Sequence, residues 1–140
     1  MTRRHPLHVS VLGAVALGGA VGAALRHLLT VLAPDDTGFP WTTFGINVSG
    51  AFLLALLPAS AWVRRHHVVP PLLGTGVLGG FTTLSAWSEQ TRALVDAGAV
   101  ATAALYVTGT LAACLAAVAL ADRFSAPAER AEFDEEEGDL

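Results

Sequence analysis

The chain has 140 residues, of which 53% are hydrophobic and only 14% are charged, and its mean hydropathy is +0.54. Soluble domains carry about 25% charged residues, so this composition favours lipid over water as the surrounding medium. The net charge of −4 divides unevenly: the stretch from Asp122 onward has eight acids and two arginines (−6), whereas residues 1–121 have four acids and six arginines (+2). Without a basic stripe, we expect no nucleic-acid partner.

Four long uncharged runs locate candidate membrane spans. They hold 21, 27, 23 and 25 residues and lie between Arg4 and Arg26, Asp36 and Arg64, Arg65 and Glu89, and Asp96 and Asp122. A helix needs roughly 20 mostly apolar residues to cross the hydrocarbon. The sequence therefore predicts an all-α membrane protein with four transmembrane helices. Their approximate bounds are 7–32, 40–63, 70–94 and 98–121.

The end of the chain differs from the rest. Residues 125–140 are polar, acidic and almost devoid of aliphatic side chains, which is typical of a disordered segment. We expect residues 1–124 to form one four-span domain and residues 125–140 to form an acidic, disordered tail.

The third span contains an unusual segment. Residues 79–85 read GGFTTLS, which places two glycines and three hydroxyls near the middle of the run. These are poor helix formers, so the sequence allows a break that frees backbone carbonyls at membrane depth. Freed carbonyls coordinate cations, and the N-terminus of a half-helix faces anions. The alternative is a continuous helix whose hydroxyls bond back to the carbonyls four residues earlier.

Three isolated polar residues need partners. Asn47 lies well inside the second span, where it either joins two helices by an interhelical hydrogen bond or lines a polar path as a donor. Arg26 and Glu89 lie near span ends and are expected to reach the interface or to pair.

The fourth span bears a weakly polar stripe that is typical of helix packing. Its members recur every four residues: Thr102, Tyr106, Thr110 and Cys114. No nucleophile–base pair is apparent in the sequence, so we do not expect an enzyme.

Three sequence blocks follow one another along the chain: GGAVGAALR at 18–26, TFGINVSGAF at 43–52 and GGFTTLSAWSE at 79–89. By these blocks, the chain resembles the Fluc-type fluoride channels of the CrcB family over residues 13–121. The resemblance implies an antiparallel, dual-topology-type dimer of four-span subunits in which the third helix is broken. It also implies a structural Na⁺ at the dimer centre, held by the backbone carbonyls of Gly79 and Thr82, with two pores along the dimer.

The resemblance further implies which residues meet the ion. The expected anion path comprises Asn47, Thr83, Leu84, Ser85, Trp87, Tyr106 and Thr110, and the expected vestibule residues are Arg26 and Glu89. The family's two phenylalanines fall on Leu84 and Trp87 in this chain. An aromatic edge carries partial positive charge that attracts an anion, so this feature is lost at Leu84 and altered at Trp87.

The implied function is fluoride-selective conduction. Fluoride is small and strongly hydrated, and donors such as amides and hydroxyls replace its water in a confined space. We expect a multi-pass channel of the plasma membrane that releases cytoplasmic fluoride down its electrochemical gradient and relieves fluoride toxicity. The alternatives are a small four-span multidrug or cation exporter, which needs a carboxylate within the membrane, and a non-conducting partner subunit.

The distribution of arginine predicts one membrane orientation. With four spans, six arginines share the side of the N-terminus, whereas at most Arg26 and Arg92 lie on the other side. Such a bias favours a cytoplasmic N-terminus. An antiparallel homodimer requires insertion in both orientations, so the bias favours a heterodimer with a homologous subunit. A homodimer of mixed insertion is the alternative.

Overall fold

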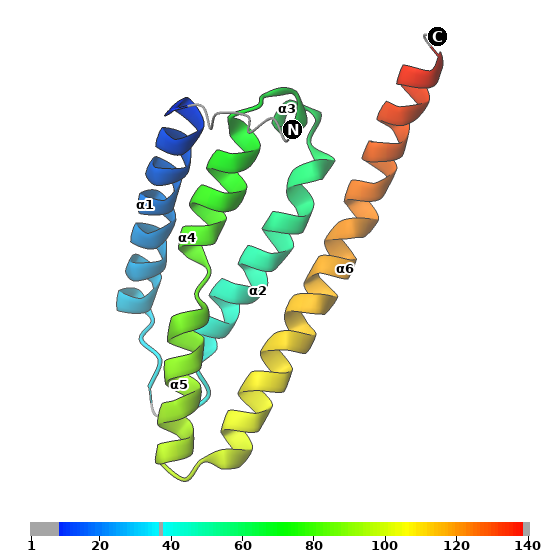
Figure 1. Cartoon of the computed structure of the whole chain (residues 1–140). Coiled ribbons are helices and arrows are strands. Elements are labelled where there is room, and N and C mark those ends of the chain that lie inside the picture. Colours follow the sequence, from blue (N-terminus) through cyan, green and yellow to red (C-terminus); the bar gives the residue numbers. More distant parts are fainter. Residues whose placement is uncertain (1–8, 37, 139–140) are drawn as a thin grey trace, which may run out of the picture.

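The structure is a computed structural model that describes residues 9–36 and 38–138, with side chains as far as Ser125. All regular structure within these residues is helical, which confirms the predicted all-α class (Figure 1). The elements are α1 (Val9–Leu32), α2 (Trp41–Leu56), the 3₁₀-helix η1 (Leu57–Ala59), α3 (Ala61–Arg65), the π-helix η2 (Pro71–Leu78), α4 (Gly79–Phe81), α5 (Leu84–Asp96) and α6 (Val100–Gly138).

Three helical stretches are long and apolar enough to cross a membrane. They are Val9–Leu32, Trp41–Ala59 and Val100–Ser125, and they correspond to the first, second and fourth predicted spans. The region of the third predicted span is divided among η2, α4 and α5. The four-span count therefore stays a prediction.

Glycines bring α1 into direct contact with the backbone of η2 and α4. A Cβ atom at Gly18 would lie 2.4 Å from the Leu72 carbonyl oxygen, and one at Gly22 would lie 2.0 Å from that of Val77. From the other side, a Cβ at Gly80 would lie 2.4 Å from the Gly19 carbonyl oxygen. Small residues allow membrane helices to approach this closely. These close contacts fix the position of η2 and α4 along α1, and with it the start of the Gly79–Ser85 segment.

A tight reversal joins α5 to α6. Gly98 has φ +76°, and the amides of Gly98 and Ala99 donate to the carbonyls of Val95 and Leu94. This pair of bonds is a Schellman motif, in which glycine accepts the left-handed conformation without strain. The reversal returns the chain along α2, and Ser125 Oγ of α6 donates to the Ala55 carbonyl of α2 at 2.9 Å.

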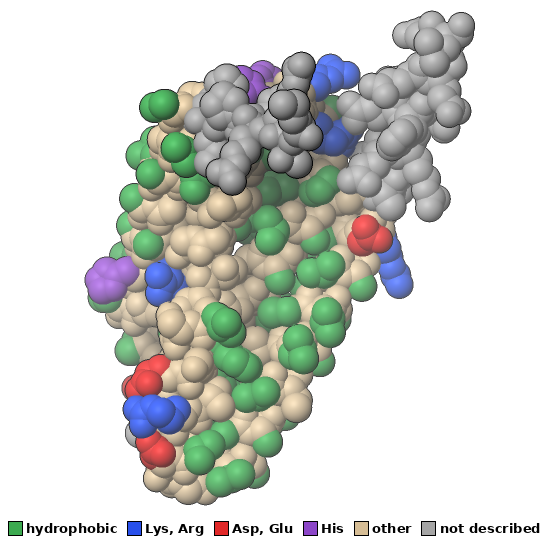
Figure 2. All heavy atoms as spheres, viewed as in Figure 1, with side chains coloured by type: hydrophobic (Ala, Val, Ile, Leu, Met, Phe, Trp, Pro, Cys, Tyr) green, Lys and Arg blue, Asp and Glu red, His purple; other side chains and the backbone are tan. Residues whose placement is uncertain are grey.

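Apolar side chains cover the outside of the molecule. Figure 2 shows hydrophobic side chains spread over the visible face, with most of the charged ones toward its two ends. Large aliphatic residues of α1 and α6 are exposed, among them Leu17, Val31, Leu111 and Leu115, each at least 61%. A soluble monomer rarely presents so much apolar surface, so these faces fit contact with lipid or with another membrane helix.

Helix α6 continues beyond its apolar part to Gly138. Its backbone is therefore helical across much of the stretch for which the sequence predicts disorder, while 139–140 lie outside the described residues. The local composition offers a physical reason, because alanine, glutamate and arginine are strong helix formers. The division into a 1–124 domain and a 125–140 tail stays a prediction.

Candidate functional site

The helical chain is interrupted at Thr82 and Thr83. Both residues have extended backbones, with ψ of 157° and 117°, between the end of α4 and the start of α5. Thr82 Oγ1 donates to the Leu78 carbonyl at 2.9 Å, and Thr83 Oγ1 accepts the Ala86 amide at 3.1 Å as the N-cap of α5. The Thr83 hydroxyl thus satisfies an amide in the first turn of α5 that has no partner within the helix, whereas the Thr82 hydroxyl adds a second donor to the Leu78 carbonyl, which already accepts the Thr82 amide at 3.0 Å.

Asn47 of α2 binds the backbone of Thr83 with both of its polar atoms, and this pair of hydrogen bonds is called the clasp below. Its Oδ1 accepts the Thr83 amide at 2.8 Å, and its Nδ2 donates to the Thr83 carbonyl at 3.1 Å. Asn47 therefore forms the interhelical bond that the sequence offered as one of two readings. Because an amide nitrogen carries two hydrogens, one donor of Nδ2 remains after this clasp.

The carbonyls of Gly79 and Gly80, just before the interruption, differ in their hydrogen-bond donors from those of a continuous helix. In a continuous helix the Thr83 amide would bond to the Gly79 carbonyl, but here it bonds to Asn47. The Gly80 carbonyl accepts from Arg26 Nε at 3.3 Å, so Arg26 ties α1 to α4. Carbonyl oxygens are the ligands that hard cations prefer, and Gly79 has lost its helical donor. The chemistry of this segment therefore fits a bound cation.

An open pocket of about 460 Å³ lies beside the interruption. Seven of the predicted site residues line it: Asn47, Gly79, Thr82, Thr83, Leu84, Trp87 and Thr110. The other lining residues are Gly50, Ala51, Leu54, Gly74, Leu78, Val107, Leu111 and Cys114. The pocket thus gathers the second, third and fourth predicted spans around a mostly apolar space with a few polar groups. This is the usual composition of a small-ligand site.

Thr110 and Trp87 each bring a buried hydrogen-bond donor to the pocket, but only the donor of Thr110 has a partner in the part of the chain that the structure describes. Thr110 Oγ1 is buried and donates to the Tyr106 carbonyl at 2.6 Å. The Trp87 indole Nε1 is also buried, yet it has no hydrogen-bond partner among the described residues. A buried donor without a partner typically costs about 1–3 kcal/mol, which marks Trp87 as unusual within the site.

Four predicted site residues lie outside the lining of the pocket. Arg26 holds the Gly80 carbonyl, as described above, and Ser85 is exposed with its Oγ 3.2 Å from Thr83 Oγ1. Glu89 lies on the exposed face of α5 and pairs with Arg92, whose Nη2 is 2.6 Å from Glu89 Oε1. Tyr106 is fully buried.

A polar network below the pocket contains residues that the sequence did not single out. Asp35, in the α1–α2 connection, accepts the amides of Thr42 and Thr43 at 2.7 and 3.1 Å. Gln90 Nε2 of α5 donates to Asp35 Oδ2 at 3.0 Å, and the Tyr106 hydroxyl of α6 donates to Gln90 Oε1 at 2.8 Å. The network therefore joins a loop, α2, α5 and α6. The sequence contains one asparagine, Asn47, and one glutamine, Gln90. The rarity of side-chain amides was the signal that could have singled out Gln90.

The network also lowers the pKa of the Asp35 carboxyl. Burial would raise the pKa of Asp35, but hydrogen bonds from Thr42, Thr43 and Gln90 outweigh burial and hold the pKa below its ordinary value. Asp35 is therefore a stable anion at neutral pH. It also sits close to the first turn of α2, where negative charge is favourable.

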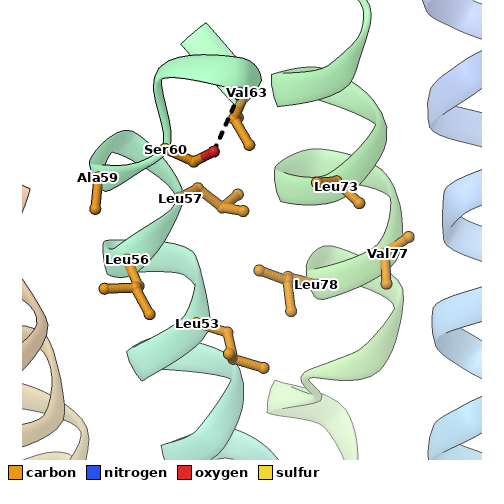
Figure 3. A pocket seen from close by; sticks show the side chains of 9 residues that line it. All are labelled: Leu53, Leu56, Leu57, Ala59, Ser60, Val63, Leu73, Val77 and Leu78. Atoms are coloured by element: carbon orange, nitrogen blue, oxygen red, sulfur yellow. Dashed lines mark hydrogen bonds between the residues drawn. The ribbon is translucent and has the colours of Figure 1, made fainter.

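A second pocket, of about 480 Å³, lies between the α2–η1–α3 corner and η2 (Figure 3). Its lining is hydrocarbon except for Ser60, and the side chains of Leu53, Leu57, Leu73 and Leu78 surround the space. Ser60 Oγ accepts the Val63 amide as the N-cap of α3. Ser60 is thus the one polar side chain of this lining, and the interruption with its clasp, which gathers several polar groups, is the better candidate site.

A family model and individual relatives point to the same group of known proteins. A family model described as CrcB-like protein, Camphor Resistance (CrcB), matches residues 13–121. The fluoride-specific ion channel FluC 2 of Nocardia farcinica is 44% identical over 119 residues, which is 82% of this chain and 84% of the relative.

Two further relatives come from one organism, Streptomyces avermitilis. Its fluoride-specific ion channel FluC 2 is 45% identical over 105 residues, covering 72% of this chain and 66% of the relative. Its FluC 3 is 46% identical over 121 residues, covering 84% of this chain and 59% of the relative. The chain thus spans 66% and 59% of the length of these two relatives.

Proposed function

The chain belongs to the CrcB family, and from this premise we propose that it is a fluoride-selective ion channel. It lies in the plasma membrane and lets cytoplasmic fluoride leave the cell down its electrochemical gradient. The names of the relatives and the apolar helices support this function. They disfavour the multidrug or cation exporter that the sequence left open, and they disfavour an enzyme.

The observation that carries the proposal is the Asn47 clasp beside the pocket. The clasp fixes the amide of Asn47 at the interruption and leaves one Nδ2 hydrogen that is not used by Thr83. A rigid donor in a largely apolar, confined space replaces part of the hydration shell of a small anion. Asn47 is therefore proposed as a donor to the ion, with the extended Thr83 backbone as its support.

We propose that η2, α4, the interruption and α5 together form one broken span, the third of four. Irregular backbone is tolerated at membrane depth only where protein covers it or where it lines a cavity. Both conditions are supported: α1 covers one side through its glycines, and the pocket lies on another. The exposed lining residues Leu84 and Leu111, at 77% and 61%, then face a second subunit in an antiparallel dimer.

A structural Na⁺ at the dimer centre is part of the proposal. The backbone carbonyls of Gly79 and Thr82 would hold it, because both lie beside the pocket at the interruption and the Gly79 carbonyl has lost its helical donor. When bound, the cation would supply positive potential that attracts anions without obstructing the path. Arg26 supports the segment from α1 through the neighbouring Gly80 carbonyl.

We propose a heterodimer with a homologous subunit. The arginine bias favours a single orientation of this chain, and numbered homologues from one organism show that such chains occur in sets. A partner would supply aromatic side chains at the place where this chain has Leu84.

A growth assay tests the proposed function in cells. Expression of the chain, alone or with a homologous subunit, should restore growth in fluoride to bacteria that lack their own fluoride channels. Because a membrane protein at high expression can alter growth unspecifically, the Asn47→Asp variant at equal expression is the control. Failure of every pairing to restore growth would overturn the proposal.

A further inference from the structure

We propose that Asp35 is a positioning residue for the ion path. Its carboxylate sets the direction of the hydrogen bonds that run through Gln90 to Tyr106, and it thereby commits the Tyr106 hydroxyl proton to Gln90. The link to conduction rests on the proposed function, whereas the direction of the hydrogen bonds does not.

The direction follows from the chemistry of a carboxylate. An ionised carboxylate only accepts hydrogen bonds, so the Gln90 atom 3.0 Å from Asp35 Oδ2 has to be Nε2. The second hydrogen of Nε2 goes to Thr43 Oγ1 at 2.9 Å, and the Thr43 hydroxyl proton goes to Asp35 Oδ2 at 2.8 Å. Both amide hydrogens of Gln90 are therefore used on the side of Asp35.

The amide oxygen of Gln90, Oε1, then faces Tyr106. This oxygen accepts, and the Tyr106 hydroxyl 2.8 Å away has to be the donor. Tyr106 is 0% exposed, so water does not compete for its proton. The Tyr106 proton is consequently not available to an anion while Asp35 is ionised, and only its lone pairs face other partners.

The same bonds hold α5 in place. Gln90 lies three residues after Trp87, and it is tied to the α1–α2 connection, to α2 and to α6 at once. The N-terminal end of α5 carries Leu84 and Trp87, which line the pocket. Movement of Gln90 would therefore move one wall of the ion path.

The test uses the full chain and the Asp35→Asn variant. Asparagine keeps an oxygen for the Thr42 amide and remains a good partner for a helix start, but it places an amide donor where Oδ2 accepts from the Thr43 amide, Thr43 Oγ1 and Gln90 Nε2. Gln90 is then free to turn its amide over, which makes Tyr106 an acceptor. Asp36→Asn is the matched control, because Asp36 is an exposed acid one residue away that makes no hydrogen bond within the described chain.

Raman spectroscopy reads the outcome directly. The ring doublet of tyrosine reports whether its hydroxyl donates or accepts, and Tyr106 is the only tyrosine in the chain. We expect a donor signature in the wild-type protein and in Asp36→Asn, and a shift toward an acceptor in Asp35→Asn. An acceptor signature in the wild-type protein, or an unchanged donor signature in Asp35→Asn, would overturn the inference even if no protein conducts fluoride.

Flux tests the link to conduction. In liposomes, Asp35→Asn should lower the fluoride efflux rate about tenfold, because α5 loses the charged hydrogen bond that anchors it through Gln90 and the wall of the ion path moves, and Asp36→Asn should keep the wild-type rate. Equal rates for the two variants, with the wild-type protein conducting, would overturn the positioning role. Absence of flux in the wild-type protein would instead count against the proposed function and leave the Raman result to decide the direction.

Discussion

Asn47 holds the Thr83 backbone by two bonds, and this geometry determines what a substitution there does. In Asn47→Asp the shape is kept, but the donor to the Thr83 carbonyl becomes an acceptor, and a negative charge enters the proposed anion path. We expect the variant to fold and to lose fluoride flux, measured as efflux from liposomes. Ser49→Ala is the control, since Ser49 lies on the same helix and only bonds back to α2. Retained flux in Asn47→Asp would assign Asn47 to helix packing alone.

Asp35 should make the stability of the protein depend on acid. Its pKa in the folded state is below the ordinary value of 3.8, so its contribution to stability is complete above that value and is lost as the pH falls through the folded pKa. Thermal unfolding in detergent should therefore show a melting temperature that drops below about pH 4. In Asp35→Asn this part of the drop should disappear. An identical acid profile in both proteins would contradict the network as described.

At the scale of elements, the contact of α1 with η2 and α4 depends on glycine. A Cβ at Gly22 would lie 2.0 Å from the Val77 carbonyl oxygen, whereas one at Gly13 meets nothing within 4 Å. Gly22→Ala should therefore push α1 away and destabilise the protein by about 1–3 kcal/mol, as overpacking does. Gly13→Ala should stabilise it by up to about 1 kcal/mol through helix propensity. Equal melting temperatures for the two variants would show that the interface yields easily.

The sequence predicted the elements well where composition alone decides them. Charge-free runs located three helices that the structure shows as long and apolar. The segment 79–85 was open between a break and a continuous helix, because local propensities are weak and tertiary contacts decide. The clasp by Asn47 supplies such a contact, and the hydroxyls of Thr82 and Thr83 add local bonds to the Leu78 carbonyl and the Ala86 amide.

The site was harder to predict than the helices. Asn47 stood out because an amide within an apolar run needs a partner, but its partner is 36 residues away. Asp35 and Gln90 are 55 residues apart and meet only because α5 lies against the start of α2, which no local pattern reveals. Tyr106 was placed in the ion path by resemblance, and this placement stays a prediction; no local pattern revealed that its hydroxyl donates to Gln90.

For the whole molecule, the proposed dimer gives Leu84 a special position. Leu84 is 77% exposed and lines the pocket, and by the resemblance drawn from the sequence it stands at the position of a phenylalanine in the fluoride channels. Leu84→Phe should therefore raise the fluoride efflux of this chain reconstituted alone, because the edge of the ring attracts an anion. Leu84→Met, of similar size without a ring, should leave the rate unchanged. A rise in both variants, or in neither, would mean that the partner is not needed for its aromatic side chains.

Selective efflux tests the central claim most directly. Liposomes are loaded with fluoride and chloride, and the purified chain, alone and paired with a homologous subunit, is incorporated at known density. We predict that fluoride leaves and chloride stays in at least one pairing, and that the fluoride efflux is lost in Asn47→Asp. Equal permeation of the two ions, or permeation of neither in any pairing, would contradict the assignment of this chain as a fluoride channel.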